Sequence, residues 1–336
     1  MFPYSIEFLE ETVNKDLMDH FRGEKTGFCQ VGPQKWLLPA AYAAHAEKYY
    51  SMPIREDDVW IITYPRSGTT LCQELIWLLN NELDFKTSSE IKLNARFPFY
   101  EFAILNNEKL HNEIIELNSN NPDIVENLKQ WRTPGYIKAE MMKSPRHLKT
   151  HLPFSLLPQN VGEACKAIYV ARNPKDVAVS YYHHNRLIQL HGYNGDFKQY
   201  WKYFENDLLV FSPYWEHIKE GWERRNKPNI LFLFYEDIIK DMPGAIKTVA
   251  KFLNKTISTD DIDALVNHLQ IDNFKKSVPL AENVPMEGVF KKDEESFIRR
   301  GKIGGNKELT EDMMDGVEKW IEDNLNNTGI EFPIKF

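Results

Sequence analysis

The feature that most constrains the fold is an apolar run that passes through a glycine-containing turn into a helical pattern. Residues Val59 to Thr63 are apolar and rich in β-branched side chains, and from Thr69 onward apolar residues recur at helical intervals. Between them lies the segment Tyr64-Pro65-Arg66-Ser67-Gly68, in which Gly68 lets the backbone approach a ligand closely. This order predicts a buried strand, a tight loop and a helix.

The loop has the chemistry of an anion site. Ser67, Thr69 and Thr70 place hydroxyl groups beside the free amides of a helix N-terminus, and Arg66 adds a charge that can grip two oxygens at once. The same residue types are also common turn and capping residues, so the loop alone leaves phosphate binding and simple capping open. It differs from the usual nucleoside-triphosphate loop, which needs an earlier glycine and a lysine before the Ser/Thr.

Charge and cysteine usage narrow the class of protein. A net charge of −8 argues against a nucleic-acid polymer as partner, whereas clusters of Lys and Arg near turns favour a small polyanion. Cys29, Cys72 and Cys165 are widely spaced, which predicts neither a disulfide framework nor a zinc site. The early sequence turns acidic before any apolar run has grown, and no stretch reaches the length of a spanning helix, so we expect a cytoplasmic protein without membrane association.

Two further apolar runs, residues 167–171 and 230–234, are each followed by polar residues and a helical pattern. A shorter alternating run, residues 146–153, places Lys149 and His151 two positions apart, so both point to the same face of a strand. A lone histidine is more often structural than catalytic, but the paired lysine favours a functional role. We therefore predict a single α/β domain over residues 1–336, with a central, mostly parallel sheet, helices on both faces and a phosphate-binding strand-loop-helix.

Polar residues follow these strands at the edge where open α/β sheets bind ligands. Arg172 directly follows one strand, Ser180 lies about two helical turns further on, and Tyr235 follows another strand. Near the C-terminus, residues 297–307 combine four cations with three glycines, a pattern that suits either a solvated loop or a clamp on a phosphate. Residues 311–325 predict a closing amphipathic helix.

Three other segments are expected to surround this core. Residues 37–50 form the best helical pattern of the first 57 residues, which should cover one side of the core. Phe99 and Phe102 belong to a proline-interrupted aromatic cluster that suits core packing or the wall of an apolar pocket. Residues 106–134 are polar without a sustained pattern and predict a long surface insertion, with residues 103–137 acting as a lid.

Five of these stretches follow one another in an order typical of a known family. They are Tyr64 to Thr70, Lys149 to Pro153, Tyr169 to Tyr182, Phe234 to Asp237 and Arg299 to Gly301. Together they resemble the 5′-phosphosulfate loop, the catalytic strand end, the 3′-phosphate segment and two further binding motifs of the cytosolic sulfotransferases. The resemblance runs over most of the chain.

The resemblance implies 3′-phosphoadenosine 5′-phosphosulfate as cofactor, no metal, and sulfonate transfer to a hydroxyl or amine of a small lipophilic acceptor such as a phenol, sterol or other alcohol. It implies that His151 is the general base, for which a near-neutral pKa is suitable, and that Lys149 and Arg66 stabilise charge on the leaving oxygen. The implied cofactor-binding residues are Arg66, Ser67, Gly68, Thr69, Thr70, Leu71, Arg172, Ser180, Tyr235, Phe274, Arg299, Arg300 and Gly301. Phe99, Phe102, His151 and His184 are implied to line the acceptor pocket.

Some positions depart from the family pattern. Arg66 stands where lysine is usual, and because Arg does not readily donate a proton, any acid role shifts to Lys149 or disappears. Leu71 replaces a Trp that commonly stacks on adenine, and the dimerisation pattern is not intact in residues 307–315, which leaves monomer and homodimer open. The long insertion and Arg66 are similar to those of insect members, including retinol dehydratase, in which the transferred sulfate serves as a leaving group.

The sequence therefore leaves three alternatives to the formation of a stable sulfate ester. The first is sulfonation followed by elimination, as in the dehydratase. The second is a catalytically silent binder of a nucleotide or lipophile, against which the intact pair of Lys149 and His151 argues. The third is a phosphate-transferring kinase, which would need a metal site and a loop lysine that this loop lacks.

Overall fold

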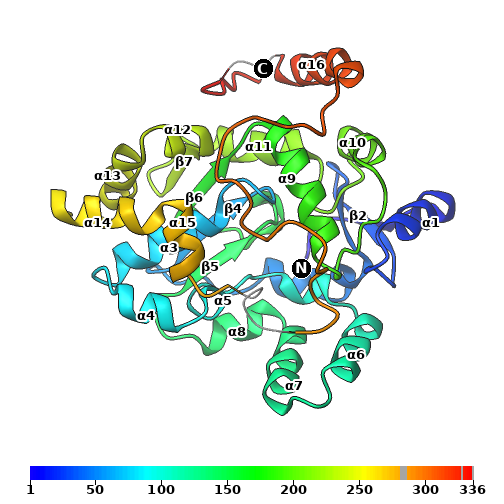
Figure 1. Ribbon diagram of the computed structural model, residues 1–336, viewed down its shortest axis with the longest axis horizontal. Helices are drawn as coiled ribbons and strands as arrows, with labels where there is room; N and C mark the ends of the chain where they lie inside the picture. Colours follow the sequence, from blue (N-terminus) through cyan, green and yellow to red (C-terminus); the bar gives the residue numbers. More distant parts are fainter. Residues whose placement is uncertain (281–285, 327, 335–336) are drawn as a thin grey trace.

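A four-stranded parallel sheet forms the centre of the protein (Figure 1). The computed structural model describes residues 1–280, 286–326 and 328–334. Its strands run in the order β5 (His147–Thr150), β4 (Val59–Thr63), β6 (Lys166–Ala171) and β7 (Ile230–Phe234). In register, Ile61 of β4 lies opposite Lys149 on one side and Ile168 on the other. The predicted parallel sheet is confirmed.

Helices cover both faces of this sheet because its strands are apolar on both faces. Val59, Ile61, Ile168 and Val170 pack with α3 (Thr69–Asn80), α13 (Met242–Phe252), α14 (Thr259–Leu269) and α15 (Ile271–Ser277). The alternate positions Trp60, Ile62, Ala167 and Tyr169 pack with α9 (Pro174–Leu187), α10 (Phe197–Glu205) and α11 (Tyr214–Glu223). The remaining elements of the core are α4 (Phe85–Glu90), α5 (Leu93–Arg96), η2 (Phe102–Leu105), η4 (Phe154–Leu156) and α12 (Tyr235–Lys240).

The N-terminal segment forms a second, antiparallel sheet of β1 (Ile6–Phe8), β2 (Phe28–Val31) and β3 (Trp36–Pro39), with α1 (Glu11–His20) between the first two strands. It packs on the α9 side of the core, as expected. The single helix predicted over residues 37–50 is wrong. Leu37 and Leu38 instead pair with β2 and are fully buried, and the chain then forms η1 (Ala40–Ala44) and α2 (Ala46–Tyr50). At Leu37 and Leu38, pairing with β2 is therefore more favourable than continuing the local helical pattern.

The insertion is helical, so the expectation that it lacks a regular pattern is wrong. It contains α6 (Glu108–Leu117), α7 (Pro122–Lys129), η3 (Gln130–Arg132) and α8 (Gly135–Met141), and α6 and α7 project from the lower end of the molecule (Figure 1). The side chains of Asn107 and Asn121 accept hydrogen bonds from the first-turn amides of α6 and α7. These caps are the local signal for the two helices. Their apolar side chains form a separate small cluster with Met286 and Val289.

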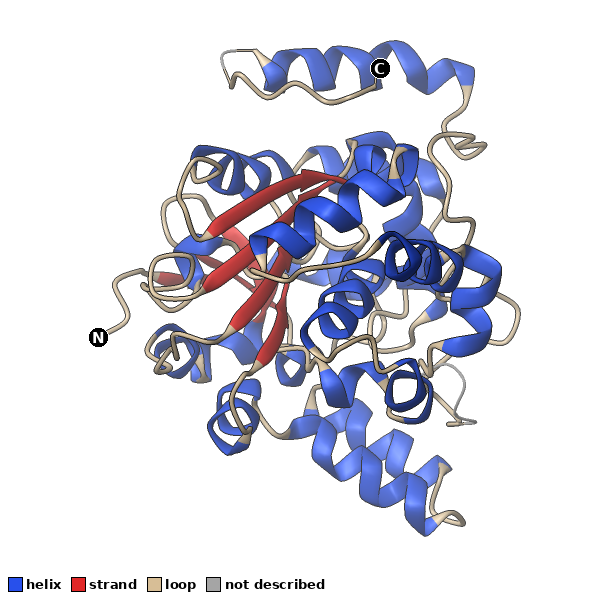
Figure 2. Ribbon diagram, turned by 90° about the vertical axis from the view of Figure 1, so that its left-hand side faces the viewer, coloured by secondary structure: helices blue, strands red, loops and turns tan. Residues whose placement is uncertain are grey.

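The closing helix α16 (Glu311–Leu325) has the predicted bounds and lies at the opposite end of the molecule from α6 and α7 (Figure 2). Its Trp320 ring packs against Trp201 and Trp215, with ring centroids 5.5 and 5.4 Å away. None of the described helices is both long and apolar enough to cross a lipid bilayer.

Candidate active site

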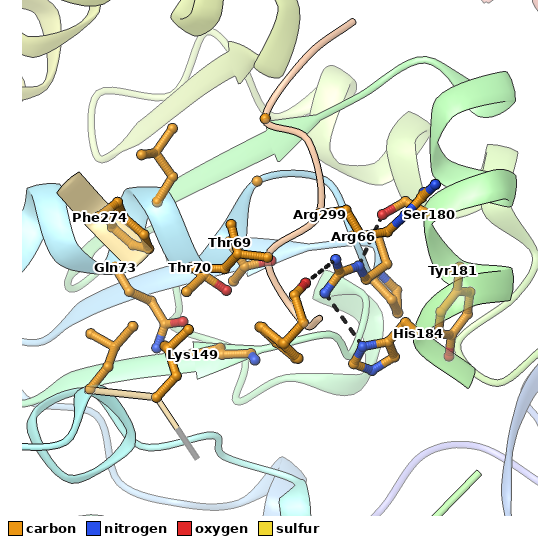
Figure 3. Close-up of a pocket in the computed structure, with 18 of the residues that line it drawn as sticks. Arg66, Thr69, Thr70, Gln73, Lys149, Ser180, Tyr181, His184, Phe274 and Arg299 are labelled. Carbon is orange, nitrogen blue, oxygen red and sulfur yellow. Dashed lines mark hydrogen bonds between the residues drawn. The ribbon is translucent and has the colours of Figure 1, made fainter. Parts of the chain in front are cut away.

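A cavity of about 600 Å³ opens at the carboxyl ends of β4, β5 and β6. Its walls come from the β4–α3 loop, β5, α9, α15, the start of the insertion and residues 297–306 (Figure 3). The structure thus brings together segments far apart in the chain. The predicted site residues that line it are Arg66, Gly68, Thr69, Thr70, Leu71, Phe99, Phe102, Lys149, His151, Arg172, Ser180, His184, Tyr235, Phe274, Arg299, Arg300 and Gly301. Ser67 lies in the same loop but is buried behind this wall.

The β4–α3 loop is shaped to present backbone amides. Arg66 and Gly68 both have positive φ angles, 69° and 97°, whereas Ser67 between them does not. Alternation of this kind turns successive N–H groups into one concavity that attracts anions. No side chain caps the start of α3, so its first amides remain available. A Cβ at Gly68 would come within 2.5 Å of the Tyr235 ring, so glycine is required there.

Several buried polar atoms around the cavity have no hydrogen-bond partner among the described residues, and they include the Ser67 hydroxyl, Arg172 Nε and Arg299 Nη2. The other guanidinium nitrogens of Arg172 donate to the carbonyl oxygens of Arg66 and Lys302, and the group stacks on the Tyr235 ring at 4.4 Å. Because buried polar atoms are normally paired, these residues fit an anionic ligand that would complete their hydrogen bonding.

The Arg66 guanidinium joins three walls of the cavity (Figure 3). Its Nε donates to Ser180 Oγ at 3.1 Å, and its Nη2 donates to the carbonyl oxygen of Phe297 at 2.7 Å. Its Nη1 lies 3.4 Å from His184 Nδ1. The side chain is therefore directed toward α9 and the C-terminal loop, which brings the predicted 5′- and 3′-phosphate residues into direct contact.

The C-terminal loop is held against the start of α9 by Asp176. Its carboxylate accepts hydrogen bonds from the Gly304 amide, at 3.0 and 3.1 Å, and from Asn306 Nδ2 at 2.6 Å. Arg300 Nη1 donates to the carbonyl oxygen of Gly305 at 2.7 Å, which stabilises the turn itself. Of the cations and glycines of this segment, Arg299, Arg300, Gly301, Lys302 and Gly304 line the cavity.

His151 is held in one tautomer by its position just beyond β5. Its Nδ1 lies 2.8 Å from the carbonyl oxygen of Thr63, which can only accept, so Nδ1 carries the proton and Nε2 of the neutral ring is unprotonated. Burial and the Lys149 cation hold the pKa of His151 well below its usual value. The pKa therefore lies below the near-neutral value expected for this residue, and the ring is neutral with an unprotonated Nε2.

Lys149 shares the cavity with His151. Its Nζ lies 4.4 Å from the centroid of the Phe99 ring, and it forms no hydrogen bond or ion pair with the described residues. Burial lowers the pKa of Lys149 to about 8; Glu101 opposes this shift and Arg66 adds to it. Lys149 is therefore a desolvated cation directed at the cavity.

An aromatic wall leads away from this pair. The Phe99 ring meets His151 at 5.0 Å and Phe102 at 6.0 Å, and Phe102 meets Trp131 of the insertion at 5.3 Å. Of the two readings of this cluster, the structure favours the pocket wall, because Phe99, Phe102 and Trp131 all border the cavity. On the other side, Leu71 and Phe274 provide apolar surface from α3 and α15.

The sequence alone missed several residues of the site. Glu101, Trp131, Lys138 and Phe297 were not expected there, although the last three line the cavity and Glu101 lies behind it. An acidic residue inside an aromatic run is a signal that could have identified Glu101, because a buried carboxylate needs partners. The others carry no local signal. Among the described residues, no group of His, Cys, Asp and Glu could hold a metal ion.

Comparison with known proteins gives a consistent result. The family model described as a sulfotransferase domain matches residues 56–329. Luciferin sulfotransferase from Photinus pyralis is 33% identical over 326 residues, which cover 95% of this chain and 84% of that protein. Sulfotransferase 1C2 from Oryctolagus cuniculus is 33% identical over 80% of this chain and 82% of its own.

Solved structures agree over almost the whole length. Retinol dehydratase in complex with retinol and PAP matches with a TM-score of 0.91 and 35% identity, covering 99% of each chain. The same values hold for retinol dehydratase in complex with androsterone and the inactive cofactor PAP.

Proposed function

The chain belongs to the sulfotransferase family, and from this premise we propose that it transfers a sulfonate group from 3′-phosphoadenosine 5′-phosphosulfate to a hydroxyl or amine of a small lipophilic acceptor. The observation that carries the proposal is the cavity itself, in which His151 and Lys149 stand between an anion-binding loop and an aromatic wall. The retinol dehydratase structures contain PAP together with a lipophilic alcohol, which supports both halves of the proposal.

The residues around the loop fit the nucleotide. The free amides of the loop and the hydroxyls of Ser67, Thr69 and Thr70 would hold the 5′-phosphate, since the Ser67 hydroxyl lacks a partner among the described residues. Arg172, Ser180, Arg299, Arg300 and Gly301 would hold the 3′-phosphate, and Leu71, Tyr235 and Phe274 would contact the base. The phosphate charges are met by these cations and not by a metal ion in this proposal.

The donor supplies a sulfonate group on a phosphate leaving group. His151 Nε2 takes the proton of the acceptor hydroxyl as the new oxygen–sulfur bond forms and the sulfur–oxygen bond to phosphate breaks. Lys149 stabilises the negative charge left on the phosphate oxygen, an effect worth roughly 3 kcal/mol for a well-placed donor. The hydrogen bond from His151 Nδ1 to Thr63 keeps the imidazole oriented during this transfer.

We assign Arg66 an electrostatic and organising role. A guanidinium does not readily release a proton, so any proton donation to the leaving group belongs to Lys149. The contacts of Arg66 with Ser180 and Phe297 support this division, because they link the two phosphate regions before any anion is bound.

The acceptor would lie against Phe99, Phe102 and Trp131. Residues 103–137 would act as a lid over it, since this insertion supplies Trp131 to the wall and has its own small apolar cluster. His184, which also lines the cavity, would contact the acceptor from α9.

A second outcome is sulfonation followed by elimination, as the name retinol dehydratase describes. The match to that protein over 99% of both chains favours it. A polyene alcohol would then leave as a dehydrated product, whereas a phenol or sterol would leave as a stable sulfate ester.

The test is incubation of the purified protein with ³⁵S-labelled donor and a panel of phenols, sterols and polyene alcohols, followed by mass spectrometry. We expect a labelled sulfate ester, or a dehydrated polyene with released labelled sulfate. Binding of PAP without turnover of any acceptor would instead indicate a silent binder. A stable ester from the polyene alcohol, with no dehydrated product, would rule out elimination.

A further inference from the structure

We infer that Glu101 is a positioning residue for the catalytic pair: its carboxylate fixes the end of β5 behind His151 and places an acidic group beside Lys149. The inference rests on the proposed sulfonate transfer, for which Lys149 must be charged. Glu101 follows the aromatic wall, has no exposed surface and does not line the cavity.

The Glu101 carboxylate holds the end of β5 from behind. Its Oε1 accepts a hydrogen bond from the His151 amide at 2.5 Å, and its Oε2 accepts one from Thr150 Oγ1 at 2.7 Å. Thr150 Oγ1 in turn accepts one from the Leu152 amide at 3.0 Å. One carboxylate therefore fixes the backbone on which the His151 ring is mounted.

The segment that carries Glu101 is itself locked to Lys149. Phe99 forms a parallel bridge with Lys149, the Tyr100 amide donates to the Lys149 carbonyl at 2.7 Å, and the Lys149 amide donates to the carbonyl of Pro98 at 3.0 Å. Residues 98–100 thus form a single bridge beside the end of β5. Glu101 cannot move relative to Lys149 without breaking this pairing.

The charges around Lys149 give Glu101 its second role. Burial lowers the pKa of Lys149, Glu101 raises it and Arg66 lowers it further, while Lys149 in turn lowers the pKa values of His151 and His184. Burial raises the pKa of Glu101 to about 7, against the pull of its two hydrogen bonds and of Lys149. Its other titratable neighbours, Tyr42, Tyr49 and Tyr100, have raised pKa values and stay uncharged.

A buried carboxylate is costly, and a neutral amide could pair with the same two groups by accepting from the His151 amide and donating to Thr150 Oγ1. A neutral side chain does not supply a negative charge beside Lys149. Burial and Arg66 both disfavour the protonated form of this lysine. Removal of that charge should therefore lower the pKa of Lys149 even if the geometry is kept.

Glu101→Gln separates the two roles. The amide oxygen can accept from the His151 amide and the amide nitrogen can donate to Thr150 Oγ1, so the positions are retained while the charge is lost. We would measure the rate of acetylation at Lys149 against pH by mass spectrometry, and kcat/KM for the donor against pH. Both profiles should move to lower pH by about one unit or more in the variant.

Glu101→Asp is the complementary variant, because it keeps the charge but shortens the side chain. It should lower kcat about tenfold or more through misplacement of His151, with KM for the donor and the pH of the Lys149 profile near those of the wild type. Glu220→Gln is the matched control, since Glu220 is a buried carboxylate that accepts from the Ser155 amide at 2.8 Å and does not act on Lys149. Its Lys149 profile should not move.

An unchanged Lys149 acetylation profile in Glu101→Gln would overturn the charge role, and full kcat in Glu101→Asp would overturn the positioning role. The acetylation of Lys149 is measured in the absence of the sulfonate donor and of any acceptor substrate. If the wild type transfers sulfonate to no acceptor, the proposed function fails while the acetylation shift still tests the link between Glu101 and Lys149.

Discussion

The Nδ1 atom of His151 lies 2.8 Å from the carbonyl oxygen of Thr63, the last residue of β4. The strand that leads into the anion-binding loop thus also orients the proposed base on the neighbouring strand. The proposed anion site and the proposed base therefore lie at the carboxyl ends of two neighbouring strands, β4 and β5.

Replacement of the base should stop turnover and spare nucleotide binding. In His151→Ala we expect turnover to fall by about 10²- to 10⁴-fold, because the variant lacks the proposed base. Radiolabel transfer measures turnover, and isothermal titration calorimetry with PAP measures binding. The His20→Ala variant serves as control, because the half-buried His20 ring does not line the cavity. Retained turnover in purified His151→Ala would remove the general-base role.

Nucleotide binding should raise the pKa of His151. Burial lowers this pKa in the protein alone, the Lys149 and Arg66 cations lower it further, and a bound polyanion opposes the effect of these cations. The fraction of protonated His151 at a given pH should therefore increase when PAP is added. Imidazole NMR titrations with and without PAP measure the change. A pKa that stays the same or falls would show that the nucleotide phosphates do not act on these cations.

The Arg66 side chain should matter for its shape as well as its charge. Arg66→Lys keeps the charge but loses at least one of the contacts with Ser180 and Phe297, so we expect about tenfold weaker PAP binding. Arg66→Ala should weaken it further. Calorimetric titration with PAP at two salt concentrations measures the affinity of each variant. Equal affinity of Arg66→Lys and the wild type would contradict the organising role.

A methyl group at Gly68 should damage the loop. At φ 97°, and with the Tyr235 ring 2.5 Å from the added Cβ, Gly68→Ala should cost roughly 1–3 kcal/mol of stability and weaken PAP binding. Thermal unfolding and calorimetry measure the two effects. In the control Gly316→Ala, the Cβ meets nothing within 4 Å in the middle of α16, so stability should rise by about 0.5–1 kcal/mol. If the Gly68→Ala variant were as stable as the wild type and bound PAP equally well, glycine would not be required in the β4–α3 loop.

Trp131, at the far end of the aromatic wall, should contribute to acceptor binding and not to PAP binding. Trp131→Ala removes the ring that packs on Phe102, so we expect KM for a lipophilic acceptor to rise about tenfold while PAP affinity stays constant. Steady-state kinetics with the best acceptor of the panel measures this change. A loss of PAP affinity of similar size would place Trp131 in the nucleotide region instead.

The sequence predicted the sheet well because three of its four strands, β4, β6 and β7, are short apolar runs with polar residues directly after them. Ile230–Phe234 and Glu311–Leu325 have the expected bounds. It failed at Leu37 and Leu38, where pairing with a strand elsewhere in the chain decided the structure. The same limit applies to the site. The motifs located the ends of the cavity, but the hydrogen bond from Arg66 to Phe297 joins residues 231 positions apart and has no local sequence signature.

The separate apolar cluster of the insertion has a consequence for how such a protein can diversify. Leu110, Ile114, Ile124 and Leu128 pack with Trp131 and not with the two clusters that flank the sheet. Substitutions among them can reshape the wall near Trp131 without disturbing the residues that stabilise β4 and β5. Under the proposed function, mutations in this cluster would change the acceptor preference while leaving the residues at the carboxyl ends of the strands unchanged.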